Sequence, residues 1–288
     1  MKKFFIILAT VLLIAGLGIF TIAFAAAGFK IGNLGSVKTE ENTYAPEGSF
    51  EDISIDVDTS DVKFVYAEDG EFKVVCRELA NDKHEVEIED GTLKISNNDK
   101  RKWYEKIQFL SFSKSPTMTI YLPEREYKNL KIKASTGDIN VPVDEGLNFA
   151  NVDIKVSTGD VNFVGNVSGD AKIKTSTGDV KQTGHTDGDL EIEVSTGDIF
   201  LKSSRTVGKL NVKTSTGDVK LDKCDAAEIT IKTSTGDVKG SLLSDKIFTA
   251  KTSTGDVDVP ASIKDGGECS IKTSTGDIKI TIEYETED

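Results

Sequence analysis

The chain has 288 residues, and its 48 Asp and Glu side chains outnumber its 35 Lys and Arg side chains, which gives a formal net charge of −13. This acidic balance argues against a nucleic-acid partner, because binding to a phosphate backbone needs basic patches. The three cysteines form no CxxC pair and the two histidines, His84 and His185, lie far apart in the sequence. A zinc site, a redox motif or a disulfide framework therefore has little support, and we expect no cofactor.

The N-terminus combines two lysines with a long apolar run. Residues 1–3 include Lys2 and Lys3, and residues 4–29 contain no charged side chain. About 20 apolar residues suffice to cross a bilayer as a helix, and lysines before such a helix stay in the cytoplasm. We predict a cytoplasmic stub at 1–3 and one transmembrane helix at 4–29, so the rest of the chain lies outside the cytoplasm at the cell membrane. The alternative is a cleaved secretory signal, although the apolar part of such signals is usually shorter.

The next two stretches differ in their patterns. Residues 30–49 are polar and contain glycine and proline, so we interpret them as a linker between membrane and folded part. Residues 50–130 contain several alternating runs of apolar and polar residues and predict an irregular β segment. Within it, Thr59-Ser60-Asp61-Val62 is a degraded copy of the repeat that follows.

A basic cluster at residues 100–104 lies beside the only tryptophan, Trp103. We interpret it as a loop whose aromatic side chains pack on the end of the β segment. The functional alternative is a contact with anionic lipid headgroups or cell-wall polymer.

Residues 131–288 are dominated by the tetrapeptide Ser-Thr-Gly-Asp, which occurs eight times without a substitution. Such a short, regular period is typical of stacked repeats. Successive repeat glycines are 19 to 22 residues apart. We expect these glycines to form sharp structural turns, because glycine adopts left-handed conformations readily. They are Gly137, Gly159, Gly178, Gly197, Gly217, Gly236, Gly255 and Gly276.

Counted from each glycine, the apolar residues fall into fixed columns seven and five residues before it and two after it, with a looser column four after it. Lysine dominates the position four residues before the glycine, with Glu193 as the exception. Each unit therefore predicts a strand, a turn at Thr-Gly and a second strand. Two architectures fit: hairpins in an antiparallel meander, or coils of a parallel β-solenoid. We favour an all-β fold with a parallel solenoid of ~19-residue coils, because like residues then stack on like at about 4.8 Å.

The repeated aspartates would form one row in such a solenoid. We interpret the Asp and Ser side chains as acceptors of backbone N–H bonds at the turn. Calcium between coils is the alternative, although calcium needs six to eight oxygen ligands and one Asp per coil supplies few. The weak metal candidates are Asp160, Asp179, Asp198, Asp218, Asp237 and Asp256.

Two other activities have weaker support. Thr-Ser-Thr runs resemble the threonine arrays of ice-binding solenoids, but their parity places these threonines on the inward face. A catalytic set of Ser, His and Asp, or of Cys and His, does not assemble from the sequence, and a row of identical aspartates provides no acid and base of different environment. We therefore expect no enzyme activity.

Two stretches resemble a known family. Ile53-Ser-Ile-Asp-Val and the run from Ile120 to Ile139, Ile-Tyr-Leu-Pro-Glu-Arg-Glu-Tyr-Lys-Asn-Leu-Lys-Ile-Lys-Ala-Ser-Thr-Gly-Asp-Ile, are similar to the bacterial putative-adhesin β-strand-repeat domains, a domain of unknown function. The resemblance covers residues 50–288. Membrane-anchored members of the LiaG-like type in Gram-positive bacteria share the layout of an anchor followed by repeats.

The resemblance implies a β-solenoid at the cell surface and provides no catalytic residues. We expect an adhesin-like or cell-envelope binding and scaffolding module, with cell-wall polymer or an envelope protein as its partner. The alternatives are a protein-interaction component of an envelope-stress system and a calcium-binding repeat module.

Overall fold

The computed structural model describes residues 16, 18, 39–80, 82–97, 115–142 and 147–284. The predicted stub, almost all of the predicted transmembrane helix and the basic cluster at 100–104 lie outside the described residues. Among the residues that are described, no helix is long and apolar enough to cross a membrane. All strands belong to one of two compact units, and that unit alone is described below.

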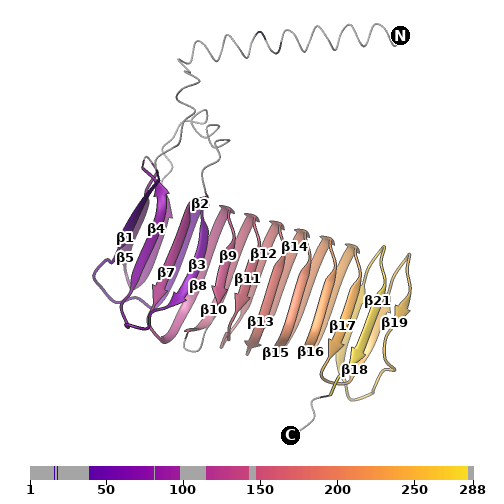
Figure 1. Cartoon of the computed structure of the whole chain (residues 1–288). Coiled ribbons are helices and arrows are strands. Elements are labelled where there is room, and N and C mark those ends of the chain that lie inside the picture. The colour runs from indigo at the N-terminus through magenta and orange to yellow at the C-terminus, as the bar shows by residue number, and fades with distance from the viewer. Residues whose placement is uncertain are drawn as a thin grey trace. The chain divides into compact units, whose positions relative to one another are not determined.

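Most strands stack in two rows, like the rungs of a ladder (Figure 1). The first row consists of β2 (Asp52–Thr59), β6 (Thr92–Asn97), β8 (Arg125–Thr136), β10 (Leu147–Thr158), β12 (Ala171–Thr177), β14 (Leu190–Thr196), β18 (Lys246–Lys251) and β20 (Gly267–Lys272). The second row consists of β3 (Asp61–Tyr66), β7 (Thr117–Leu122), β9 (Ile139–Pro142), β11 (Val161–Val164), β13 (Val180–Thr186), β17 (Val238–Leu242), β19 (Val257–Asp258) and β21 (Ile278–Ile282). Two longer strands, β15 (Ile199–Thr216) and β16 (Val219–Thr235), contribute one half to each row.

The pairing between coils is parallel and keeps equivalent residues opposite each other. Ile154 of β10 lies opposite Ile173 of β12, which lies opposite Ile192 of β14 in the next coil. This register confirms the stacked-coil prediction, because hairpins of a meander would pair antiparallel.

The apolar columns fill the space between the two rows of strands. The residue five positions before the glycine is at most 1 % exposed in every repeat except the one that contains Ala250, which is partly buried. These residues are Ile132, Ile154, Ile173, Ile192, Val212, Ile231 and Ile271. Four threonines of the Thr-Ser-Thr runs are also buried, as their parity predicts: Thr175, Thr214, Thr233 and Thr273. The second threonine of each run is exposed, contrary to the prediction that these threonines face inward, because the strand ends there at the corner: Thr177, Thr216, Thr235, Thr254 and Thr275.

The corner glycines are held in a conformation that excludes side chains. The φ angles of all eight lie between 134° and 147°. A Cβ added at Gly197 would lie 2.1 Å from the carbonyl oxygen of Gly178 in the neighbouring coil. Glycine at this corner therefore provides both the backbone conformation and the close approach of the coils.

The order of the coils in space differs from their order in the sequence at both ends. The last repeat, β20 and β21, lies between the β16–β17 coil and the β18–β19 coil, so β18 and β19 form the end of the stack. At the other end, β2 and β3 lie between the β6–β7 coil and the β8–β9 coil.

Antiparallel strands close the N-terminal end of the stack. β4 (Lys73–Leu79) pairs with β7, and β5 (His84–Glu89) pairs with β6. β1 (Thr39–Tyr44) pairs with β4, although it lies within the stretch interpreted as a linker. The interpretation missed this strand because Thr39–Tyr44 lacks apolar alternation and is held by backbone pairing to an existing edge.

Candidate functional site

The aspartates of the repeated tetrapeptide form a hydrogen-bonded row along one corner of the stack. In each coil the Oδ1 of the aspartate accepts the backbone N–H of the aspartate in the next coil, at 2.7–3.0 Å. The row begins at the degraded copy, where Asp61 accepts from the N–H of Asp138. Neighbouring carboxylates in such a row repel each other by about 1 kcal/mol in water, and hydrogen bonds to charged acceptors are strong enough to offset this.

This row leaves few oxygens for a cation. Among the six calcium candidates, the Oδ1 atoms of Asp160, Asp179, Asp198, Asp218 and Asp237 accept a backbone N–H. Asp256 lies in the end coil and donates its own N–H to Asp277. One remaining oxygen per coil is far from the six to eight that calcium takes, so the absence of a metal site remains our prediction and calcium between the coils the alternative.

The position four residues before each glycine forms a second row, on the outer face of the first row of strands. In spatial order it contains Lys133, Lys155, Lys174, Glu193, Lys213, Lys232, Lys272 and Lys251. Parallel neighbours are about 4.8 Å apart. The register thus places seven lysines and one glutamate in an unbroken line.

Glu193 is the centre of this line. Its carboxylate pairs with Lys174 on one side and with Lys213 on the other, where Oε1 lies 2.9 Å from Nζ. Hydrogen bonding to Lys174 and then to Lys213 lowers the pKa of Glu193 to about 2. Glu193 is therefore ionised at neutral pH.

A groove of about 440 Å³ runs beside the lysine row. Its second wall is a row of serine hydroxyls two residues before the glycine, and Val156, Val194 and the buried threonines line its floor. The serines that line it are Ser176, Ser195, Ser215 and Ser234, and all four are exposed. These four serines therefore face the groove, and among the described residues of the repeats it is the aspartates that show the backbone bonding we expected of both residue types.

A larger hollow of about 550 Å³ lies at another corner and includes Lys246, His185 and Arg205. Lys246 is 3 % exposed, and its Nζ donates to Asp225, to the carbonyl of Ala226 and to Ser244. The three acceptors satisfy the ammonium group, so its burial is structurally accounted for.

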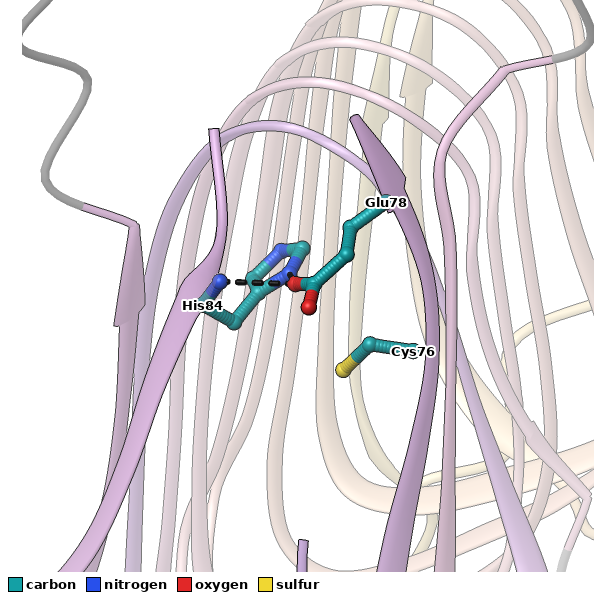
Figure 2. Close-up of side chains that lie close together, drawn as sticks. All are labelled: Cys76, Glu78 and His84. Atoms are coloured by element: carbon teal, nitrogen blue, oxygen red, sulfur yellow. Dashed lines mark hydrogen bonds and ion pairs between the residues drawn. The ribbon is translucent and has the colours of Figure 1, made fainter. Parts of the chain in front are cut away.

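A polar cluster lies inside the N-terminal end of the stack (Figure 2). Glu78 on β4 faces His84 at the start of β5, and Cys76 lies beside them. Oε2 of Glu78 is 2.7 Å from both the backbone nitrogen and the Nδ1 of His84. Its Oε1 accepts from Asn42 at 2.7 Å and from the Tyr44 hydroxyl at 2.6 Å, so both carboxylate oxygens are fully used.

Burial and hydrogen bonding set the charges of this cluster. Burial raises the pKa of Glu78, but hydrogen bonds from Tyr44, His84 and Asn42 outweigh it and leave the pKa below its usual value. Burial also raises the pKa of the Cys76 thiol to about 12, with the Glu78 charge acting in the same direction. Glu78 is thus a carboxylate and Cys76 a neutral thiol at pH 7.

The ligand atoms of Cys76, Glu78 and His84 lie within 4.8 Å of one another. Among the described residues this is the one group of three such side chains. Cysteine, histidine and carboxylate are zinc ligands in general. Here each carboxylate oxygen already accepts two hydrogen bonds, so the arrangement fits a hydrogen-bonded cluster better than a metal centre.

The cluster also contains a Ser-His-Glu relay that the sequence did not reveal. The Oγ of Ser60 lies 3.1 Å from the Nε2 of His84, whose Nδ1 contacts Glu78. These contacts have the geometry of a catalytic triad. However, Ser60 is 1 % exposed and His84 is 4 % exposed, so a substrate has no access to the hydroxyl. The relay instead connects the first repeat corner to β4 and β5.

Comparison with known proteins identifies the family. The profile of the Toastrack DUF4097 family matches residues 50–281. The chain belongs to this family. The family is a domain of unknown function. The match extends from the degraded first repeat into β21 of the last repeat, in agreement with the resemblance noted in the sequence.

Solved structures are similar to this chain at low sequence identity. A crystal structure of a putative adhesin from Bacteroides fragilis is 16 % identical with a TM-score of 0.53, over 85 % of this chain and 98 % of that chain. A crystal structure of a putative lipid binding protein from Parabacteroides distasonis is 17 % identical with a TM-score of 0.43, over 86 % of this chain and 98 % of that one. Among curated proteins, none matches the chain significantly.

Proposed function

We propose that the protein is a membrane-anchored, extracytoplasmic β-solenoid that acts as an adhesin-like or cell-envelope binding and scaffolding module without catalysis. Family membership and the fold shared with a putative adhesin support this proposal. The apolar run at 4–29 behind two lysines supports the anchor and the orientation.

The proposal rests on which side chains are exposed at the surface and which are buried. The outer surface presents the same side chains coil after coil, in rows of lysine, serine and aspartate. The one relay with catalytic geometry among the described residues is buried. A long rigid surface with repeated groups is suited to multivalent binding of an extended partner.

The test is made on the full-length protein with a C-terminal epitope tag, produced in a Gram-positive host. Protease added to intact cells should remove the tag, and the tagged protein should sediment with membranes and be retained by isolated cell walls. A tag that is protected in intact cells would contradict the orientation. Cross-linking to a membrane kinase without retention by walls would favour the role in an envelope-stress system instead.

A further inference from the structure

The lysine row and the serine row together define a surface to which the proposed function assigns no ligand. We infer that the groove between them binds a linear polyanion, a polymer with negative groups at regular intervals along an extended chain. This inference rests on the proposed function as a binding module and names the class of its ligand.

The first argument is the charge of the row. Within the described part of the chain, Lys155, Lys232, Lys251 and Lys272 form no ion pair with the protein, although Lys133, Lys174 and Lys213 do. Of these four, Lys155 and Lys232 line the groove, and Lys272 and Lys251 continue the row beyond Lys232 in the next two coils. Like charges about 4.8 Å apart repel, and a bound anion of opposite sign removes that repulsion.

The second argument is the shape of the groove. It extends across five coils, from Lys155 to Lys232, and its floor is shallow because the side chains beneath it are valine and threonine. A shallow channel of this length fits an extended chain better than a compact molecule, which would need an enclosed pocket. The ligand is therefore a polymer rather than a single ion.

The third argument is the chemistry of the two walls. Lysine ammonium groups bind phosphate and carboxylate as point charges, and the row contains no arginine for planar bidentate contacts. Ser176, Ser195, Ser215 and Ser234 add exposed hydroxyl donors at the same interval as the lysines. Both walls thus donate hydrogen bonds, which suits a chain of anionic acceptors.

The net charge of −13 does not oppose local binding of this kind. The aspartate row lies around the corner, where Asp138, Asp160 and Asp179 line a separate hollow together with Asn140 and Asn162. Within the groove the carboxylate is that of Glu193, and it is neutralised by two lysines.

Glu193 makes the inference specific to this groove. It interrupts the line of lysines and occupies Lys174 and Lys213. Replacing Glu193 by Gln removes one negative charge and frees the ammonium group of Lys213, while Lys174 keeps its second partner, Glu191, and the size of the side chain is unchanged. Affinity for a polyanion should therefore rise, an outcome that general damage to the protein would not produce.

The experiment measures binding of two probes to the purified full-length chain in neutral detergent: long-chain sodium polyphosphate and sodium polygalacturonate. The groove variant is Lys155→Gln with Lys232→Gln. The control is Lys202→Gln with Lys220→Gln, two exposed lysines in the second row of strands that change the net charge equally. We expect the groove variant to weaken binding roughly 2- to 25-fold and the control less than 2-fold, and Glu193→Gln to strengthen binding roughly 2- to 10-fold. Binding should also weaken as salt rises from about 50 to about 200 mM.

The two probes distinguish phosphate from carboxylate as the anionic group, and binding of either polymer supports the inference. Binding of neither polymer, equal weakening by both lysine pairs, or weaker binding by Glu193→Gln would overturn it. Competition by orthophosphate at the same phosphate concentration would also overturn it, because it would indicate a site for single ions. These measurements need no cell, so their outcome is independent of where the protein resides, which the protease test addresses.

Discussion

The regular corners and the first corner of the stack use different chemistry for the same turn. At a regular corner, glycine brings two backbones into contact, and the aspartate that follows holds the next coil. At the first corner the chain has Ser60, whose φ is not positive and whose hydroxyl contacts His84. The serine side chain at this corner thus connects the stack to the start of β5.

The largest effect is expected at a regular corner. Gly197→Ala should lower the free energy of unfolding by roughly 3–5 kcal/mol, because the added methyl overlaps the carbonyl of Gly178 and φ is 144°. Gly91→Ala is the matched control, since its φ is also positive but its Cβ meets nothing within 4 Å. It should cost roughly 1–2 kcal/mol. Urea denaturation followed by circular dichroism measures both, and equal losses would contradict the close approach of the coils.

The next largest effect is expected at the N-terminal end. Glu78→Ala removes the acceptor of Asn42, Tyr44 and His84, and should destabilise this end by roughly 3 kcal/mol. Hydrogen exchange should accelerate for amides of β4 and β5 and remain unchanged for β12 and β14. Glu85→Ala, at an exposed position of β5, is the control and should change little. Uniform acceleration along the whole stack would show that the cluster is not local to this end.

The pH dependence of this end follows from the same carboxylate. The folded pKa of Glu78 lies below the usual value of 4.5, so its contribution to stability is fully present above about pH 4.5. That contribution is lost as the pH falls through the lower folded pKa. Exchange of the β4 and β5 amides should therefore accelerate in acid, relative to β12, in the wild type but not in Glu78→Gln. An equal acid response in both proteins would exclude Glu78 as its source.

A smaller effect is expected along the aspartate row. Asp198→Ala removes the acceptor for the N–H of Asp218 and should cost roughly 0.5–1.5 kcal/mol. Asp198→Asn keeps an acceptor oxygen and removes one like charge from the row, so it should change stability by less than about 0.5 kcal/mol. If the asparagine variant is as unstable as the alanine variant in urea, the negative charge rather than the hydrogen bond holds the corner.

Much of the stack was predictable because its residues repeat in register. The parity of the columns placed Ile173 and Ile192 inside and identified Thr59–Val62 as a degraded turn, and the pairing of Thr59 with Thr136 agrees. Coil order was not predictable in the same way. Every coil presents the same rows, so the pattern says which residues share a row but not which coils are neighbours. The sequence pattern therefore did not predict that Cys269 of the last repeat pairs with Ile229 on one side and with Phe248 on the other.

The polar cluster escaped sequence analysis for a different reason. Glu78 and His84 belong to separate strands and Ser60 lies between β2 and β3, and antiparallel pairing at the stack end, rather than any spacing, brings the three together. One signal was available: the degraded repeat has serine where the regular copies have glycine. A change at a position that otherwise excludes side chains indicates a new neighbour at that corner.

The central claim is that the aspartates of the repeated tetrapeptide hold the coils together and are not a cation site. Melting of the full-length protein with and without millimolar calcium tests it most directly. Because a ligand that binds the folded state raises its stability, calcium between the coils would raise the melting temperature. We predict an unchanged midpoint, since the Oδ1 atoms already accept backbone N–H bonds. A rise of several degrees with calcium, absent in Asp198→Asn, would contradict the claim.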